Sequence, residues 1–459
     1  HFGSRELFCS MLLAASLTCM IAILDSSILP LASLLAAFVV PTLIAGDATC
    51  LASASDTSSC DDAKKILQRP AHKIPAATWH LQDSDSIAAM AASGPLTRDQ
   101  LEAFYNDGFL VLEDFYSATT LKDVQEDVEG MIDSLAKDLF AAGKIANLHS
   151  GLDWTKRLNS LRQEYADVPV LLTKRGVLPV SLRRVFAEPR LLDVVSQLGV
   201  GPDVAINAAW NLRGKMQAHE ETVVPWHQDN SYWEPRIWDE NILSVWVAFV
   251  DTTRENGCMQ FVRAGHRSGK VANHTIGSST TTWYTELAED TVARELFEKD
   301  QLHENTDIAT VETRAGTVII FPGTTPHRSL DSLSDNVRWS ADWRLHRKRA
   351  ARSGQGDLDW FYGLKDSLLL REDPNVDPNY HPDWSRWANI ERTAAQDAKH
   401  GLDAAKAKMD LDPVIVGPWM DLWDLERDER GRHNPHVERY MQGPVENRDV
   451  EKYIAKGHW

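Results

Sequence analysis

The first strong pattern along the chain is LTRDQLEAFYNDGFLVLEDF, which begins at Leu96. Its apolar residues are spaced as in a short amphipathic helix, Thr97 and Gln100 can form a capping box, and Gly108 suits the helix end. The apolar run that follows, residues 109–112, predicts a short strand. The folded part of the chain is therefore expected to open with a helix and a strand.

A second helical pattern starts at Ser117. From there to Leu139 the apolar residues recur at helical spacing, which predicts a long amphipathic helix that packs on a sheet. A further helical stretch is predicted from about residue 180 to residue 198. Helices are thus expected to precede the main sheet in the chain.

The pattern changes between Val204 and Trp343, where short apolar or alternating runs are separated by turn residues. These runs are VAINAAWNL, ILSVWVAFV, CMQFVRAG, GTVIIFPG and VRWSADWRL. Several short strands of this kind indicate a β-sandwich or a barrel. With the helices before them they predict an α+β, mainly β fold. The polar stretch that follows, residues 346–459, is expected to be a C-terminal extension that packs on this core.

The beginning of the chain has a different pattern. Residues 11–45 are mostly apolar, with Pro30 and Pro41 inside the run. We interpret residues 1–60 as a targeting or membrane-anchoring segment, which leaves the secretory pathway, another organelle and a membrane surface open as locations. Residues 61–95, rich in Ser, Ala and Asp, are expected to be a linker.

The composition is that of a folded protein that does not bind nucleic acid. Apolar residues make up 43% of the chain and charged residues 25%, as in globular domains. With 66 acidic and 48 basic side chains the net charge is −18, which repels phosphate backbones. Four of the five cysteines precede residue 61, so the body of the chain is not a disulfide scaffold.

Three side chains in two separate stretches have the spacing of a metal site. In VVPWHQDNSYW, His227 and Asp229 would share one face of a strand, whereas Gln228 would point away. The stretch GTVIIFPGTTPHRSL places His327 after a predicted buried strand and a turn. Two imidazoles and one carboxylate leave three positions of an octahedral ion open, the arrangement that suits iron(II) in oxygen activation. A structural zinc site would instead favour four protein ligands, usually with cysteine.

Taken in order, these motifs carry a likeness to a known family: the region from Leu96 to about Arg344 resembles the phytanoyl-CoA dioxygenase family. LTRDQLEAFYNDGFLVLEDF is similar to the family's first helix and strand, WHQD to its first metal motif, ENGCMQFVRAGHR to its NGPLxxxPGSH turn, and HRS to its last metal ligand. The resemblance implies a double-stranded β-helix, the jelly-roll or cupin-like barrel with flanking helices, over residues 96–345. It also implies a dioxygenase that uses Fe(2+), 2-oxoglutarate and O2, with ascorbate as the expected reductant.

The resemblance also implies where the cosubstrate binds. Arg338 follows His327 by eleven residues, the offset of the family's cosubstrate arginine, and a guanidinium fork suits a carboxylate. Ser329 matches the family's hydroxyl partner, and Trp246 matches an aromatic residue beside the cosubstrate if one inserted residue is allowed. A core tryptophan packed in the sheet is the alternative for Trp246. Arg344 lies on the same face of the predicted strand as Arg338, but its offset from His327 does not match.

The expected activity is hydroxylation of a small organic or acyl substrate, with conversion of 2-oxoglutarate to succinate and CO2. Halogenating relatives lack the carboxylate that Asp229 supplies, so hydroxylation, desaturation or ring closure is favoured. Two alternatives from other classes stay open: a non-catalytic jelly-roll binding protein, and a cupin-type metal-dependent hydrolase or isomerase. The three ligands and Arg338 are all kept, which disfavours the first, and Arg338 and Ser329 would have no role in the second.

These residues do not choose the substrate. The basic run HRKRAAR, residues 346–352, is the candidate site for the phosphates of a CoA thioester, and a solvated surface run is the alternative. Trp226, Tyr232 and Trp233 flank the metal motif and are candidates for the substrate wall or for ordinary packing. Membrane contact is expected only through residues 11–45, and the oligomeric state is left open.

Overall fold

Contacts divide the chain into residues 1–69 and 70–459, and only the second unit contains residues that can be described. The predicted leader, with its apolar run, lies outside them. Within the described ranges no helix is both long enough and apolar enough to cross a membrane. The computed structural model describes residues 82–174, 177–207, 209–217, 222–233, 235–238, 240–276, 283–348, 367–386, 411–415, 417–425 and 434–442.

Helices form most of the chain before the sheets. The capping box predicted between Thr97 and Gln100 is confirmed, and the helix it begins ends at Gly108, whose φ of 84° suits glycine. Within the described ranges the α-helices are α4 (Ser84–Ala92), α5 (Arg98–Asp107), α6 (Ala118–Ala141), α7 (Trp154–Glu164), α8 (Val168–Lys174), α9 (Val180–Phe186), α10 (Pro189–Val195), α11 (Glu289–Phe297) and α13 (Pro435–Gln442).

Two expectations about the helices need correction. The segment expected as a linker contains α4, which Asp83 caps and whose Ile87 is buried in the core, so the folded unit begins before Leu96. The single helical stretch expected from residue 180 to 198 is divided instead. Its first helix, α9, ends at Phe186, and Pro189 starts a new helix because proline fits the first turn but not a helix interior.

Two antiparallel sheets follow, and with the helices they make the α+β jelly-roll fold predicted from the sequence. The large sheet has the order β1 (Leu110–Leu112), β9 (Val318–Pro322), β4 (Leu243–Ala248), β11 (Arg338–Arg347), β2 (Val204–Ile206) and β12 (Leu368–Arg371), and β3 (Asn211–Lys215) also pairs with β11. The small sheet is β10 (His327–Ser329), β5 (Met259–Val262) and β8 (Ile308–Val311). A third, short sheet joins β13 (Asp424–Leu425), β6 (Thr275–Ile276) and β7 (Thr285–Glu286).

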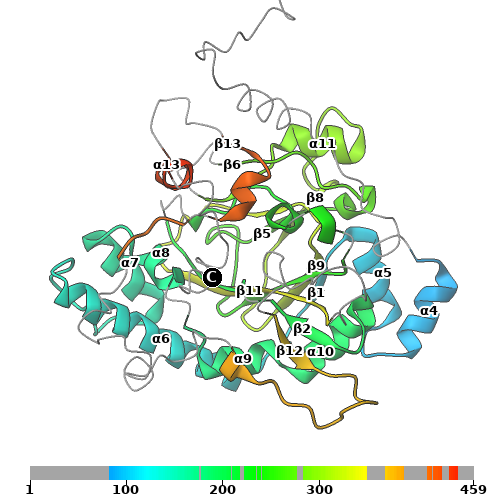
Figure 1. The fold of residues 1–459 in the computed structure, drawn as a ribbon, viewed down its shortest axis with the longest axis horizontal. Helices are drawn as coiled ribbons and strands as arrows, with labels where there is room; N and C mark the ends of the chain where they lie inside the picture. Colours follow the sequence, from blue (N-terminus) through cyan, green and yellow to red (C-terminus); the bar gives the residue numbers. More distant parts are fainter. Residues whose placement is uncertain are drawn as a thin grey trace, which may run out of the picture. The chain divides into compact units, whose positions relative to one another are not determined.

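The large sheet is buried on both faces. Helices α6, α9 and α10 cover one face, and the small sheet lies on the other (Figure 1). Because successive side chains of a strand point to opposite faces, each strand supplies both layers. On β11, Trp339, Trp343 and Leu345 pack toward the helices. The alternate residues of β11 are polar and include Arg338 and Arg344, which places charged groups between the two sheets.

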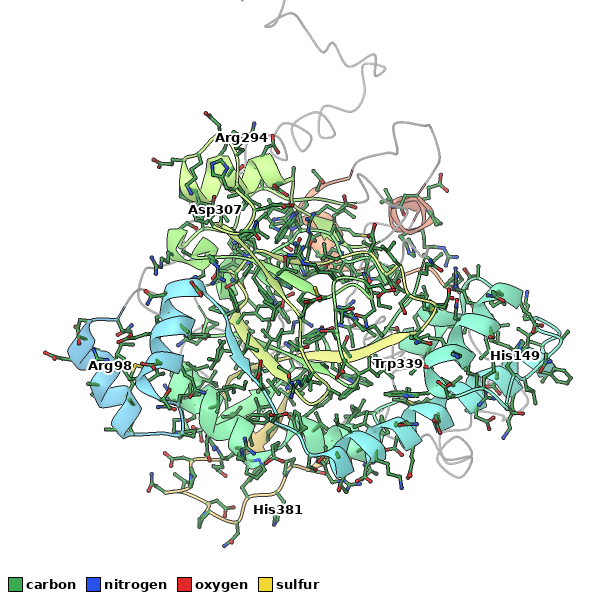
Figure 2. The ribbon with its side chains drawn as sticks, turned by 180° about the vertical axis from the view of Figure 1, so that it is seen from behind. Arg98, His149, Arg294, Asp307, Trp339 and His381 are labelled. Carbon is green, nitrogen blue, oxygen red and sulfur yellow. The ribbon has the colours of Figure 1, made fainter. Side chains whose placement is uncertain are left out.

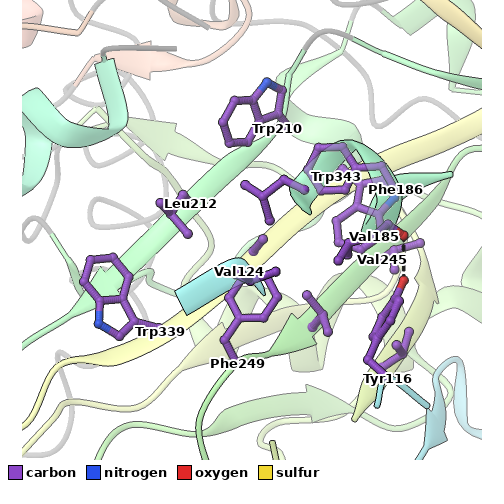
Figure 3. Packing of buried hydrophobic residues seen from close by; sticks show 14 of the residues in the cluster. Tyr116, Val124, Val185, Phe186, Trp210, Leu212, Val245, Phe249, Trp339 and Trp343 are labelled. Atoms are coloured by element: carbon purple, nitrogen blue, oxygen red, sulfur yellow. Dashed lines mark hydrogen bonds between the residues drawn. The ribbon is translucent and has the colours of Figure 1, made fainter. Parts of the chain in front are cut away.

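The layer between the large sheet and the helices is rich in aromatic rings. Trp343 lies 4.5 Å from Phe186 between ring centroids, and the hydroxyl of Tyr116 donates to the Val185 carbonyl of α9 at 2.7 Å (Figure 3). In the view from behind, side chains fill the interior around the long strand β11, beside which Trp339 is labelled (Figure 2). This packing makes β11 a rigid support for the charged side chains on its other face.

Candidate active site

The two histidines predicted as metal ligands face each other across a backbone bridge. The N–H of His227 donates to the His327 carbonyl at 3.0 Å, and the reverse bond is 2.9 Å long. The centroids of the two rings are 4.1 Å apart. This pairing joins stretches that are far apart in the sequence, and strand β10, which begins at His327, continues it into the small sheet.

Asp229 completes the set. Its Oδ1 lies 3.3 Å from Nε2 of His227 and 3.9 Å from Nε2 of His327. One donor atom from each of the three buried residues lies within 4.8 Å of the other two. The three side chains could therefore hold one metal ion between them.

Backbone carbonyls fix both imidazoles with Nε2 toward this centre. Nδ1 of His227 lies 2.9 Å from the Pro225 carbonyl, and Nδ1 of His327 lies 3.0 Å from the Thr325 carbonyl. A carbonyl can only accept, so each Nδ1 carries the proton and each Nε2 keeps a free lone pair. Burial lowers the pKa of His327 to about 3, so its ring is neutral and ready to bind a cation.

The local backbone differs from the expected strand. His227 belongs to an isolated bridge, and Asp229 begins a 3-10 turn, Asp229–Tyr232. Only Gln228 between them is extended, with φ −110° and ψ 132°, which is enough to bring the two ligands to the same side. Gln228 itself points away, and its amide donates to the Thr324 carbonyl at 2.6 Å and to the Lys270 carbonyl at 3.0 Å. No full strand forms at His227 because the 3-10 turn that begins at Asp229 ends the backbone pairing with the stretch around His327.

The residues predicted to bind the cosubstrate lie beside the metal set. Arg338 is 2% exposed, its Nη1 donates to the Gly257 carbonyl at 2.9 Å, and its guanidinium carbon lies 5.4 Å from the ring centroid of Trp246. The hydroxyl of Ser329 accepts from Nζ of Lys215 at 3.0 Å. The structure therefore gathers Arg338, Ser329 and Trp246 in one buried region.

Lys215 is a functional candidate that the sequence analysis missed. It is 1% exposed and stands directly opposite Arg338 in the pairing of β3 with β11. Burial, and then the charge of Arg338, place the pKa of Lys215 well below its usual value. The signal was the alternation of polar residues in NLRGK, which puts Asn211, Arg213 and Lys215 on one face of a strand.

This region has free donors that a carboxylate could use. Nε of Arg338 and Nε1 of Trp246 are buried and have no hydrogen-bond partner among the described residues. No carboxylate in the described ranges forms an ion pair with Lys215 or Arg338. Buried donors without a hydrogen-bond partner and buried cations without a counter-charge are costly, so the region suits an anionic ligand.

Arg344, set aside on its offset, contacts the metal set directly. Its Nη2 donates to Oδ1 of Asp229 at 2.7 Å, and its Nε donates to Oδ2 at 3.1 Å. Burial favours the neutral acid, but the guanidinium and the two histidines hold the pKa of Asp229 well below its usual range. Asp229 is therefore a carboxylate, as a metal ligand must be.

The aromatic residues around the metal motif have different roles. Tyr232 makes an edge contact with the His227 ring at 5.8 Å between centroids. Trp226 packs in a separate apolar cluster and donates from Nε1 to Glu289, and Trp233 packs in another cluster beside Trp238. Tyr232 therefore remains a candidate for the substrate wall, and the other two indoles are packing residues.

A segment of the C-terminal extension covers this turn. Trp419 contacts the Tyr232 ring at 5.5 Å between centroids, and its Nε1 donates to the Trp283 carbonyl at 3.1 Å. Nε1 of Trp423 donates to the Ser231 carbonyl at 2.7 Å. Residues far beyond the barrel strands thus hold the turn that follows Asp229.

A jelly-roll with two imidazoles and one carboxylate beside a buried cationic region has the features of a mononuclear non-haem iron oxygenase. A sequence model of the phytanoyl-CoA dioxygenase family matches residues 104–340. Phytanoyl-CoA dioxygenase from Arabidopsis thaliana is 22% identical over 269 residues, 54% of this chain and 88% of that protein. Phytanoyl-CoA dioxygenase domain-containing protein 1 from Bos taurus is 23% identical, over 54% of this chain and 90% of its own.

Similar solved structures include EctD from S. alaskensis with 2-oxoglutarate and 5-hydroxyectoine, 20% identical over 61% of this chain and 84% of that one, with a TM-score of 0.36. The non-heme monooxygenase ThoJ is 18% identical over 60% of this chain and 84% of its own, with a TM-score of 0.38. The chain belongs to the phytanoyl-CoA dioxygenase family. It is an Fe(II)- and 2-oxoglutarate-dependent dioxygenase, as the resemblance implied.

Proposed function

We propose that the protein hydroxylates a small organic or acyl substrate and converts 2-oxoglutarate to succinate and CO2. The observation that carries this proposal is the convergence of His227, Asp229 and His327 next to the buried cations of Lys215 and Arg338. The first group supplies the ligands of a metal with open positions, and the second supplies the charge that a dicarboxylate needs. Iron(II), when bound, supplies the oxygen-activating chemistry.

Different residues would bind the metal and the cosubstrate. His227 and His327 present neutral Nε2 atoms, and Asp229 presents a carboxylate. Arg338 and Lys215 would hold the distal carboxylate of 2-oxoglutarate, and the tightly packed layer around β11 keeps their positions fixed. Because Asp229 occupies the position that halide takes in halogenating relatives, the proposal is hydroxylation and not halogenation.

The substrate would approach beside Tyr232 and the C-terminal tryptophans. The Tyr232 ring contacts both the His227 ring and Trp419, so only Tyr232 lies between the segment around Trp419 and this proposed metal ligand. This segment lies beyond residue 340, where the match to the family ends. We expect Trp419→Ala to change which compounds stimulate turnover, while Trp419→Phe, which keeps a ring, changes them less.

The basic run at residues 346–352 supports a CoA thioester only in part, because Arg347 and Lys348 are exposed but His346 is enclosed. His346 is buried, burial lowers its pKa to about 4, and its Nε2 bonds the Ser367 hydroxyl at 2.8 Å. A neutral, enclosed imidazole adds no charge for phosphates. Residues 349–352 lie outside the described part of the chain.

The test is succinate release from 2-oxoglutarate by the full chain with iron(II), with ascorbate added as reductant. We expect release without added substrate at a low rate, and stimulation by one class in a panel of acyl-CoA thioesters and free small acids. His327→Ala protein is the blank, because it removes one ligand and leaves the cationic region intact. If wild-type release equals this blank for every compound and hydrolysis products appear instead, the hydrolase alternative replaces the proposal.

A further inference from the structure

Arg344 holds the metal-facing carboxylate with both of its oxygens. It donates from Nη2 to Oδ1 of Asp229 at 2.7 Å and from Nε to Oδ2 at 3.1 Å, a two-point fork. The side chain of Arg344 is 10% exposed and that of Asp229 is 1% exposed. A fork of this kind between buried groups fixes the plane of the carboxylate as well as its position.

The two oxygens of Asp229 have unequal surroundings. Oδ2 also accepts from the hydroxyl of Ser244 on β4, so two donors hold it on the side of the large sheet. Oδ1 is the atom that faces Nε2 of His227 and Nε2 of His327. Only one carboxylate oxygen is therefore offered to a metal between the histidines.

Arg344 is itself braced and cannot easily follow a moving carboxylate. Its Nη1 donates to Oδ1 of Asp342, and Asp342 also accepts from Arg213 and, at 2.9 Å, from the Asn211 amide. All these side chains project from β3 and β11, whose opposite face packs on the helices. The guanidinium is thus a fixed reference against which Asp229 is aligned.

We infer that Arg344 is a positioning residue that keeps Asp229 a one-oxygen ligand. The inference rests on the proposed metal site. A six-coordinate metal held by two imidazoles and one carboxylate oxygen would keep three positions open, enough for the keto acid of 2-oxoglutarate and for dioxygen. A carboxylate that turned to bind through both oxygens would fill a fourth position, and the keto acid would then leave no place for dioxygen.

The experiment counts water molecules on Mn(II), used as the probe metal in the metal-free full chain. Water-proton relaxation reports how many exchangeable waters the bound Mn(II) carries. In the wild type we expect three, falling to one when 2-oxoglutarate is added. In Arg344→Gln we expect relaxation lower by about one third without 2-oxoglutarate and near the outer-sphere background with it, by the same count of six positions.

Two further variants distinguish the two-point hydrogen bonding of Arg344 from its charge and from a general effect on the strand. Arg344→Lys keeps the charge but presents a point donor that cannot hold both oxygens, so it should behave like Arg344→Gln. Arg347→Gln, at the exposed end of the same strand, should behave like the wild type. Mn(II) should bind Arg344→Gln at least as tightly as the wild type, because a neighbouring positive charge is gone, while iron-dependent succinate release falls on the order of 100-fold.

Each outcome decides a separate question. Wild-type relaxation in Arg344→Gln, or full rescue by Arg344→Lys, would overturn the inference. Loss of Mn(II) binding together with a lower melting temperature in Arg344→Gln would also overturn it, because Arg344 would then only support the fold. If 2-oxoglutarate leaves wild-type relaxation unchanged, the proposed function fails, and the comparison of Mn(II) alone still tests Arg344.

Discussion

Strands β3 and β11 carry two groups of buried charges that are compensated in different ways. At the metal end, Asp342 of β11 contacts both Arg213 and Arg344, and Arg344 also contacts Asp229, which begins the neighbouring 3-10 turn. Burial would favour neutral acids, but Arg213 and Arg344 lower the pKa of Asp342 to about 2. Two negative and two positive side chains therefore balance one another within the protein.

At the other end of the same strands, Lys215 and Arg338 stand opposite each other with like charges. No carboxylate in the described part of the chain forms an ion pair with them. Burial lowers the pKa of Arg338 to about 10 and that of Lys215 well below its ordinary value. A positive charge on both side chains is therefore unfavourable without an anion beside them.

The difference shows which half of the site is complete within the protein and which half a ligand completes. The four paired charges at the metal end, here called the balanced row (Asp229, Asp342, Arg213 and Arg344), hold the metal ligands in place before any metal arrives. A negative charge from outside would compensate Lys215 and Arg338 and favour the charged form of Lys215, and the distal carboxylate of 2-oxoglutarate has that charge. Changes at the first end should therefore cost stability, and changes at the second should cost cosubstrate affinity.

The largest effect is expected from Asp342→Asn, which breaks the balanced row. Removal of one partner from a buried ion-pair network leaves the other charges exposed to each other, so unfolding free energy should fall by about 3–5 kcal/mol. Denaturant unfolding of the metal-free protein measures this loss. Asp335→Asn, on the exposed loop before β11, is the control, and a loss below about 1 kcal/mol for Asp342→Asn would show that the row is not coupled.

Arg338→Gln, at the end of the strands that carries Lys215 and Arg338, should weaken the binding of 2-oxoglutarate. A hydrogen bond to a charged group is worth about 1.5–3 kcal/mol, so the KM for 2-oxoglutarate should rise about 10- to 100-fold. Melting temperature without ligand should change little or rise. Steady-state succinate release measures KM, with Arg328→Gln as the control because Arg328 stacks on Trp226, away from Arg338. A KM within about threefold of the wild type would contradict the assignment of Arg338.

Lys215→Met should raise the stability of the ligand-free protein and lower its affinity for 2-oxoglutarate. Without ligand, a buried cation facing another cation is replaced by an apolar chain, which should stabilise the protein by about 1 kcal/mol. With saturating 2-oxoglutarate the gain should shrink, because the variant binds the ligand more weakly. Thermal unfolding with and without 2-oxoglutarate measures both. Equal destabilisation in the two conditions would mean that Lys215 serves only its bonds to Thr222 and Ser329.

The smallest effect concerns His346, which lies past both groups on β11. Burial lowers the pKa of His346 from its ordinary value of about 6.5 to about 4 in the folded protein. A depressed folded pKa means that the folded state binds fewer protons, so stability is full above pH 6.5 and falls as pH decreases toward 4. His346→Gln should remove about 1 kcal/mol of this loss between pH 7 and pH 5.5. Denaturant unfolding across that range, with exposed His303→Gln as control, measures it, and parallel pH profiles would contradict it.

The sequence predicted the elements and the chemistry that depend on local spacing. The capping box of Thr97 and Gln100 and the polar alternation along β11 follow from contacts within a few residues or from strand periodicity. His227, Asp229 and His327 could be found together because their motif has a known order. Pairing between distant strands was not visible, so the direct opposition of Lys215 and Arg338 was missed.

Tertiary contacts also explain the errors. VAINAAWNL was expected as one strand, but β2 ends at Ile206 and β3 begins at Asn211, because both pair with different parts of the long strand β11. Arg344 has the same strand parity as Arg338, and only its partner, Asp229, distinguishes its role. The contacts of Trp419 and Trp423 come from a segment with no periodic pattern, and no motif indicated them.

We expect the distal carboxylate of the cosubstrate to compensate the charges of Lys215 and Arg338. The most direct measurement is calorimetric binding of 2-oxoglutarate and of 2-oxopentanoate to the Co(II)-loaded protein, since the two keto acids differ only at the far carboxylate. We expect the wild type to bind 2-oxoglutarate on the order of 100-fold more tightly than 2-oxopentanoate and Arg338→Gln to lose most of this preference. Equal affinities in the wild type, or a preference that survives Arg338→Gln, would contradict it.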